Sequence, residues 1–311
     1  MRHVEIEIFP IAHTAVNRAE VRRWLDHLNA TKYELPPEET VTDPALLIAM
    51  AAKRCYLSFE PGLNPNVSQI RSDLTVYLDN ILKSGHGSVL EHSTWTFAIE
   101  GVSRVFTGEM NRHRAGVGIS EASMRYIRYT DIPWWVPPSM RLTNDEELAL
   151  ERAKKAADKM SSRFHSVAPL SLEAVLSLPP ADQELVNVAK KKMATFSIFN
   201  KHYLATENCY KELQCVWEDE LHPSSKFKQK KAITSMMRRI IPMGVATGGV
   251  WTMNIRAVRH IMALRASEAA EEEICYVFSR IAKIMVGAEP MLLGDFTEDE
   301  NGFWRPKYAK V

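Results

Sequence analysis

Cysteine is scarce in this chain of 311 residues, and its spacing excludes two classes of site. The four cysteines are Cys55, Cys209, Cys215 and Cys275, and no two of them form a CxxC pair. The sequence therefore has neither a zinc-ligand spacing nor a disulfide framework. We expect a protein of a reducing compartment, the cytoplasm.

Long apolar runs are also missing. No window approaches the ~18 apolar residues that a membrane-spanning helix requires. The first ten residues, MRHVEIEIFP, alternate and lack the apolar core of a signal peptide. The formal net charge of +1 gives no general reason to expect nucleic acid or an anionic membrane as a partner. We expect neither.

Two lysine-rich runs, 190–192 and 228–231, depart locally from this charge balance. A nucleic-acid site needs an aromatic stacking platform or a recognised fold signature beside such charges, and the sequence shows neither. We therefore interpret both runs as solvated faces. The pair Gly116 and Gly118 likewise lacks the third glycine and the preceding strand of a dinucleotide-binding loop.

Residue patterns predict two strands and several helices along the chain. We expect a half-buried strand at 3–12 that Pro10 closes, and a second strand at 94–99. Helical periodicity or strong helix formers predict helices at 17–29, 46–56, 74–83, 144–166, 184–221 (as one helix or two) and from 251–256 to about 285.

The stretch 109–129 carries a dense set of polar side chains. A helix predicted over 102–110 ends in Arg-His-Arg at 112–114, and Gly116 and Gly118 then form a loop that lets the backbone approach a ligand. Arginine's planar fork suits phosphate, and four arginines lie here: Arg112, Arg114, Arg125 and Arg128. The alternative is a solvated basic turn whose arginines pair with acids elsewhere.

Two further groups of polar residues have a structural interpretation beside a functional one. The segment 86–92, HGSVLEH, lacks the His-Glu-x-x-His spacing, so we expect hydrogen-bonding groups there and no metal site. Asn254 and Arg265 fall on one stripe of a predicted helix, about 16 Å apart, so only an elongated ligand reaches both. The alternative is a surface stripe in which Arg265 pairs with Glu268.

Five short segments, which cluster in three separated blocks and appear in the family's order, resemble the flavin-dependent thymidylate synthases. The matching residues are HGSVLEH at 86–92, the triplet 112–114 with Ser123 and Arg125-Tyr126 after an eight-residue spacer, Arg-x-x-x-Pro at 238–242, Asn254-x-Arg256, and Leu264-Arg265. The resemblance spans roughly residues 55–273.

This resemblance implies a fold, an assembly and a reaction. The fold is α/β (α+β type), with a mixed or antiparallel sheet flanked by helices, in a single domain over 1–311 with a helical insertion around 144–222. The assembly is a homotetramer whose active sites form between subunits. The reaction is the reductive C5-methylation of a uridine monophosphate, most readily dUMP. Methylenetetrahydrofolate supplies the carbon, and FAD, reduced by NADPH, carries the reducing equivalents.

The resemblance also implies residue roles. The cofactor-binding residues are Ser88, Glu91, Arg112, His113, Arg114, Asn254, Arg256 and His260. The substrate-binding residues are Glu109, Glu121, Ser123, Arg125, Arg238 and Arg265. Two of these act in catalysis: Ser123 as a hydrogen-bond donor to the substrate, and Arg265 as a guanidinium that stabilises negative charge on the uracil carbonyls.

Several positions depart from the family's pattern. Glu109 stands where glutamine is frequent, and a carboxylate accepts hydrogen bonds but does not donate them. Ser120 replaces a common asparagine, and Ala269 replaces a frequent histidine. Methylation of the ribonucleotide UMP is therefore the first alternative, and a non-catalytic nucleotide- or RNA-binding protein on the same scaffold is the second.

Overall fold

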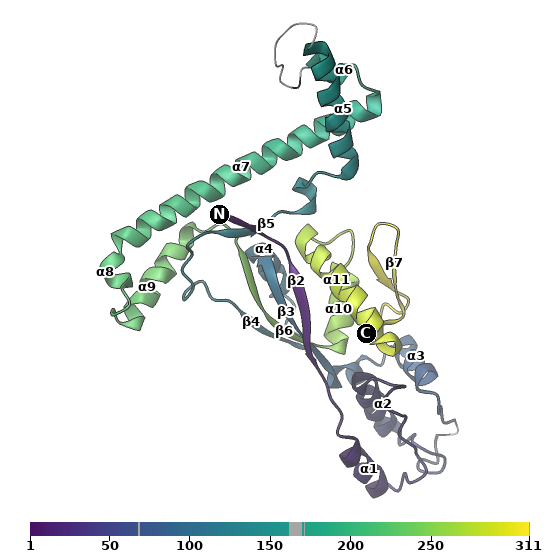
Figure 1. Ribbon diagram of the computed structural model, residues 1–311. Coiled ribbons are helices and arrows are strands. Elements are labelled where there is room, and N and C mark those ends of the chain that lie inside the picture. The colour runs from purple at the N-terminus through teal and green to yellow at the C-terminus, as the bar shows by residue number, and fades with distance from the viewer. Residues whose placement is uncertain (68, 162–169, 171, 311) are drawn as a thin grey trace. The chain divides into compact units, whose positions relative to one another are not determined.

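The computed structural model describes residues 1–67, 69–161, 170 and 172–310. The chain forms two compact units. The sheet unit comprises Glu5–Ala122 and the chain from Ala246 onward, and the helical unit comprises Met1–Val4 and Ser123–Val245 (Figure 1). A single domain over 1–311 stays a prediction.

A four-stranded antiparallel sheet is the centre of the sheet unit. Its strand order is β2 (Glu7–His13), β3 (Thr94–Ser103), β6 (Ala246–Asn254) and β4 (Val117–Glu121). Alternate residues of β3 and β6 are buried and form one face of the core, with Phe97 directly opposite Trp251. The predicted α/β fold, with an antiparallel sheet flanked by helices, is confirmed.

The prediction that Pro10 closes the first strand is wrong. β1 (Arg2–Val4) belongs to the helical unit, whereas β2 continues through Pro10 to His13. Among the described strands, β2 pairs only with β3, and the register shifts between Pro10 and Ala12. An edge strand with a bulge tolerates proline because no second neighbour needs its missing N–H.

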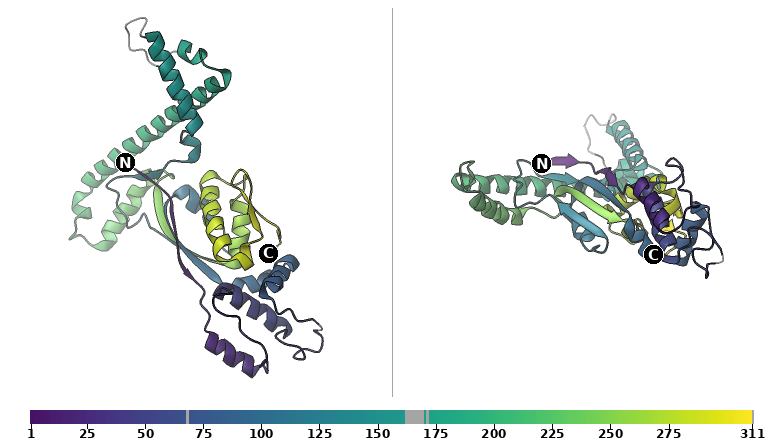
Figure 2. Two further views of the ribbon diagram at one scale, coloured as in Figure 1. Left: turned by 45° about the vertical axis from the view of Figure 1, so that its right-hand side comes forward. Right: turned by 90° about the horizontal axis from the view of Figure 1, so that it is seen from below.

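Helices cover the sheet and connect its strands. In chain order they are α1 (Arg18–His27), α2 (Asp43–Tyr56), α3 (Leu74–Ser84), the 3₁₀ turn η1 (Gly87–His92), α4 (Arg104–Met110), α10 (Ile255–Arg265), α11 (Glu272–Ala288) and α12 (Pro290–Leu293). α10 and α11 lie side by side next to the sheet (Figure 2). A hairpin of β7 (Phe296–Glu298) and β8 (Trp304–Pro306) follows.

Two predicted elements of the sheet unit are wrong. The single helix from 251–256 to 285 is instead the end of β6 followed by α10 and α11, because Asn254 caps α10 and Glu271 caps α11. Gly118 does not lie in a loop but in β4, opposite Thr252 of β6. The alternation of apolar residues in both segments fits strand pairing, which a short apolar run does not reveal by itself.

The helical unit contains the enlarged middle region. β1 pairs in parallel with β5 (Pro133–Trp135). The helices are η2 (Pro138–Met140), α5 (Asn144–Ser161), α6 (Leu172–Leu176), α7 (Pro180–Val216), α8 (Glu218–Leu221), α9 (Phe227–Met237) and η3 (Arg238–Ile240). The part of the helix predicted at 162–166 lies outside the described residues.

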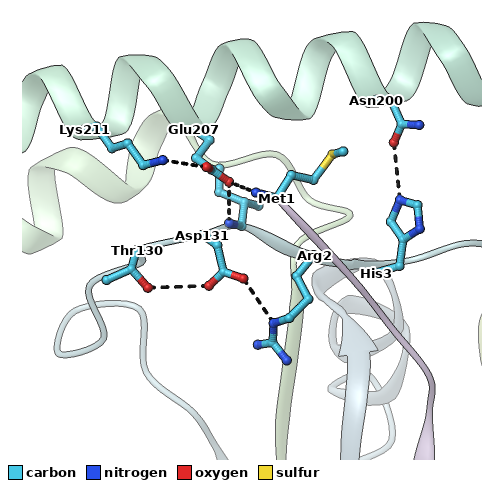
Figure 3. Close-up of polar contacts among 9 residues, drawn as sticks. Met1, Arg2, His3, Thr130, Asp131, Asn200, Glu207 and Lys211 are labelled. Atoms are coloured by element: carbon cyan, nitrogen blue, oxygen red, sulfur yellow. Dashed lines mark hydrogen bonds and ion pairs between the residues drawn. The ribbon is translucent and has the colours of Figure 1, made fainter.

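Within the helical unit, buried Glu207 of α7 holds the N-terminal residue Met1 beside β5 (Figure 3). Its carboxylate accepts hydrogen bonds from the amino group of Met1, from the backbone N–H of Ile132 at 3.0 Å and from Lys211 Nζ at 2.7 Å. Burial by itself raises the pKa of Glu207, but these donors outweigh it and lower the pKa to about 2.

Among the helices of the described ranges, none has both the length and the apolar character needed to cross a membrane.

Candidate functional site

The start of α10 is built around Asn254, one of the predicted cofactor-binding residues. Its side-chain Oδ1 accepts a hydrogen bond from the backbone N–H of Ala257 at 2.8 Å and so caps the helix. Its own backbone N–H donates to the carbonyl of Gly116 at 2.9 Å. A Cβ on Gly116, whose φ is +71°, would meet the Asn254 side chain at 2.4 Å. Glycine is therefore needed at 116 for the approach of β4 to α10.

Arg265, the last residue of α10, lies against two predicted site residues. Its Nε–H donates to Nε2 of His113 at 2.9 Å, and its NH1 group contacts Oε2 of Glu109 at 3.0 Å. The Arg265 side chain is 18% exposed and that of Glu109 is 29% exposed. Arg265 pairs with Glu109 rather than Glu268, so the interpretation of a plain surface stripe is wrong.

His113 is neutral on the nitrogen that faces Arg265, because Nε2 accepts the hydrogen bond. Burial lowers the pKa of His113, and electrostatic interactions with Arg265, His260 and Arg112 lower it further, while Glu109 opposes them. The His260 ring lies edge-on to the His113 ring with centroids 6.2 Å apart. The segment after α4 and two residues of α10 thus form one polar cluster.

A second polar contact joins η1 to α10. Arg256 NH1 lies 2.5 Å from Oε1 of Glu91, and the backbone N–H of Ile255 donates to the carbonyl of Ser93 at 2.9 Å. Ser88, in the same 3₁₀ turn, is exposed. These contacts place the predicted flavin residues of η1 next to those of α10.

Glu121 at the end of β4 is held by residues that the sequence analysis did not single out. Arg104 NH1 lies 2.6 Å from one carboxylate oxygen of Glu121, and Asn111 Nδ2 donates to the other at 2.7 Å. The start of α4 and its C-cap therefore orient this carboxylate. The only signal in the sequence was that Arg104 lies near the start of the helix predicted over 102–110 and that Asn111 directly follows it.

The remaining predicted residues fall into two groups. Arg112 and Arg114 are exposed in the turn after α4, with Arg112 3.8 Å from Glu109. Ser123, Arg125 and Arg238 belong to the helical unit, whereas Arg265 belongs to the sheet unit. The hydroxyl of Ser123 accepts a hydrogen bond from the backbone N–H of Arg125 at 3.4 Å.

No group of three or more metal-binding side chains exists within the ranges that the structure describes. A cavity of about 370 Å³ in the sheet unit is lined by Thr42, Trp95 and Glu289, among others, and contains none of the predicted site residues.

Comparisons with known proteins identify the relatives of this chain. A family model described as Thy1, thymidylate synthase complementing protein, matches residues 38–291. A protein of Mycolicibacterium vanbaalenii named flavin-dependent thymidylate synthase is 30% identical over 270 residues, 86% of this chain and 86% of that protein. A Geobacter sulfurreducens protein of the same name is 38% identical over 117 residues, 37% of this chain and 49% of that protein.

A solved structure shows the same fold. The UMP/dUMP methylase PolB from Streptomyces cacaoi, bound with 5-Br UMP, has a TM-score of 0.52 at 14% sequence identity, and the match covers 94% of each chain. Because the family model matches well over half of the chain, this protein belongs to the thymidylate synthase complementing protein family, the family of the flavin-dependent thymidylate synthases.

Proposed function

We propose that this protein catalyses the reductive C5-methylation of a uridine monophosphate, with dUMP as the first candidate. FAD is the cofactor, methylenetetrahydrofolate the carbon donor and NADPH the reductant. The observation that carries this proposal, beside family membership, is the Arg265 guanidinium held by His113 and Glu109 at the end of α10.

Arg265 suits the stabilisation of charge on a pyrimidine. Hydride transfer at C6 of uracil builds negative charge on the carbonyl oxygens, and a prepositioned guanidinium favours that charge without rearrangement. His113 and Glu109 occupy Nε and NH1, whereas NH2 has no hydrogen bond to any residue that the structure describes. This nitrogen is therefore the group that we assign to the substrate.

The residues present fit FAD. A dinucleotide pyrophosphate needs several cations and hydrogen-bond donors, which the exposed side chains of Arg112, Arg114 and Ser88 supply. When bound, FAD supplies the reducing equivalents. The protein's part is to hold the pyrophosphate with these groups and to keep His113 neutral through Arg265.

Glu109 favours UMP as a second candidate substrate. Its carboxylate is an acceptor only, and it is bound to Arg265 on one oxygen. The other oxygen lies 3.8 Å from the exposed Arg112 and suits a hydroxyl donor such as a ribose 2′-OH, which dUMP lacks.

Tritium release from C5-labelled dUMP and UMP, measured side by side with FAD, NADPH and methylenetetrahydrofolate, tests both substrates. We expect release from dUMP. Release from UMP alone or at a comparable rate would assign ribose selection to Glu109. Release from neither would leave a non-catalytic nucleotide- or RNA-binding protein. We expect such a protein to be colourless, whereas bound oxidised flavin absorbs at about 450 nm.

We also propose the homotetramer with active sites shared between subunits that the family resemblance implies. Light scattering coupled to size exclusion measures the assembly: a monomer in solution would contradict this part of the proposal.

A further inference from the structure

An exposed pair of stacked aromatic rings lies in the helical unit. The rings of Tyr126 and Phe227 are 5.8 Å apart between centroids and 9° from parallel. Tyr126 is 52% exposed and Phe227 is 67% exposed, so neither ring belongs to the core. Lys231 Nζ lies 4.9 Å from the centroid of Tyr126, within cation–π range. The sequence did not show that these two rings stack, and without an aromatic platform we interpreted the lysine run 228–231 as a solvated face.

The helix that carries Phe227 is basic along one side. α9 has three lysines and no acidic residue. At 100° per residue, Lys228, Lys231 and Arg238 fall within one quarter of the helix circumference, spread over about 15 Å along the axis. Within the described residues, Lys228 and Arg238 have no ion-pair partner. We call Tyr126, Phe227, Lys228, Lys231 and Arg238 the α9 face.

The chemistry of the α9 face calls for a ligand with a planar ring and several separated negative charges. Stacked exposed rings offer their faces to another aromatic ring, and lysines act as point charges for carboxylates. The two phosphates of a dinucleotide lie next to each other, which does not match cations spread along a helix. A folate has this combination: its aromatic rings continue into one or more linked glutamates, each with a free carboxylate.

We propose that the α9 face binds the aromatic and glutamate portions of the folate co-substrate, with Phe227 and Tyr126 on the ring and Lys228 and Lys231 on the carboxylates. The inference rests on the proposed function, because that function names folate as the carbon donor. It adds Phe227, Lys228 and Lys231, which lie outside the sequence motifs, and it assigns a length preference: folates with several glutamates bind more tightly than those with one.

Isothermal titration calorimetry of the full-length protein with 5-formyltetrahydrofolate, as the monoglutamate and the pentaglutamate, tests this inference directly. We expect the pentaglutamate to bind at least about tenfold more tightly, with a margin that shrinks as salt rises, because exposed charges are screened. In the double variant Lys228→Ala/Lys231→Ala the margin should disappear, because the pentaglutamate loses much more affinity than the monoglutamate, which has fewer carboxylates. Phe227→Ala should weaken both ligands by roughly five- to 100-fold, in line with aromatic stacking on other ligands.

The matched control is Lys190→Ala/Lys191→Ala, which removes two exposed lysines of α7. This variant should keep the full margin. Equal affinities for the two folates in the unaltered protein, or a margin that survives in Lys228→Ala/Lys231→Ala, would overturn the inference. So would a 12-residue oligothymidylate that binds more tightly than the pentaglutamate and displaces it, because the α9 face would then be a nucleic-acid site.

Tritium release separates this inference from the proposed function. A protein that releases tritium but shows no glutamate-length margin retains the proposed function and refutes the folate role of the α9 face. A protein that shows the margin but releases no tritium keeps the folate site and loses the proposed reaction.

Discussion

Arg265 and His113 share a hydrogen bond in which the guanidinium donates and the imidazole accepts, with 2.9 Å between the two nitrogens. The bond exists only while His113 is neutral on Nε2. Burial and the neighbouring positive charges favour that state by lowering the pKa of His113. The contact between the end of α10 and the turn after α4 therefore depends on the protonation state of His113.

Replacing Arg265 should separate flavin binding from turnover. In Arg265→Ala we expect flavin to be retained and tritium release to fall by roughly 10²–10³-fold, the usual cost of losing one such donor. Arg265→Lys should recover part of the rate, because it keeps the charge but not the planar fork. Flavin absorbance per protein and tritium release check both variants. Full activity in Arg265→Ala would show that the assignment of this arginine is wrong.

Glu109→Gln should lower the pKa of His113 further. The Glu109 carboxylate raises this pKa, and glutamine removes the charge with little change of shape. NMR titration of the His113 ring measures the effect. Glu121→Gln is the control, because its carboxylate is bound to Arg104 and Asn111. An unchanged pKa in Glu109→Gln would contradict the placement of the Glu109 carboxylate next to His113.

The same variant tests substrate choice. If Glu109 favours a ribose hydroxyl, Glu109→Gln should raise the rate with dUMP relative to UMP, and an unchanged ratio would remove Glu109 from substrate selection.

Buried Glu273 should make stability depend on pH. Its carboxyl accepts hydrogen bonds from the backbone N–H of Ser103, at 2.6 Å, and from the Ser103 hydroxyl, at the start of α4. Burial raises the pKa of Glu273 from 4.5 to about 7 despite these bonds. The folded state thus prefers the protonated form. This stabilisation is complete below pH 4.5, the ordinary value, and is lost as the pH rises through about 7.

The variant Glu273→Gln should remove this dependence, because the amide stays neutral. At about 1.4 kcal/mol per pKa unit, the unaltered protein should lose about 3 kcal/mol between pH 4.5 and pH 8 from this group, and the variant should not. Urea unfolding at several pH values gives both curves. Parallel curves for the two proteins would contradict the prediction.

Gly116→Ala should destabilise the junction between β4 and α10. A methyl group there meets Asn254 at 2.4 Å, in a backbone conformation with φ of +71° that alanine rarely adopts. We expect a loss of about 1–3 kcal/mol in the free energy of unfolding, including part of the helix cap. Gly118→Ala is the matched control, because its Cβ would come no closer than 3.7 Å to Thr252. Equal unfolding midpoints for the two variants would contradict the clash.

Local patterns predicted much of the architecture. The helices at 17–29, 46–56 and 74–83 match α1, α2 and α3 closely, because their apolar spacing and capping residues act within a few residues of chain. The strand at 94–99 exists as the first part of β3. Predictions failed where the secondary structure depends on contacts with a segment distant in sequence: β4 and the last part of β6 are strands because they pair with each other.

The amino-acid sequence by itself determined the residue types of the site and the family to which they point, since a motif such as Arg112-His113-Arg114 is read without knowing its surroundings. It also located most helices. Only the tertiary structure decided which groups meet: Arg265 with Glu109 and His113, Gly116 with Asn254, and Tyr126 with Phe227. Such pairs join residues far apart in the chain, and their distances follow from sheet pairing and helix packing, which no local pattern records.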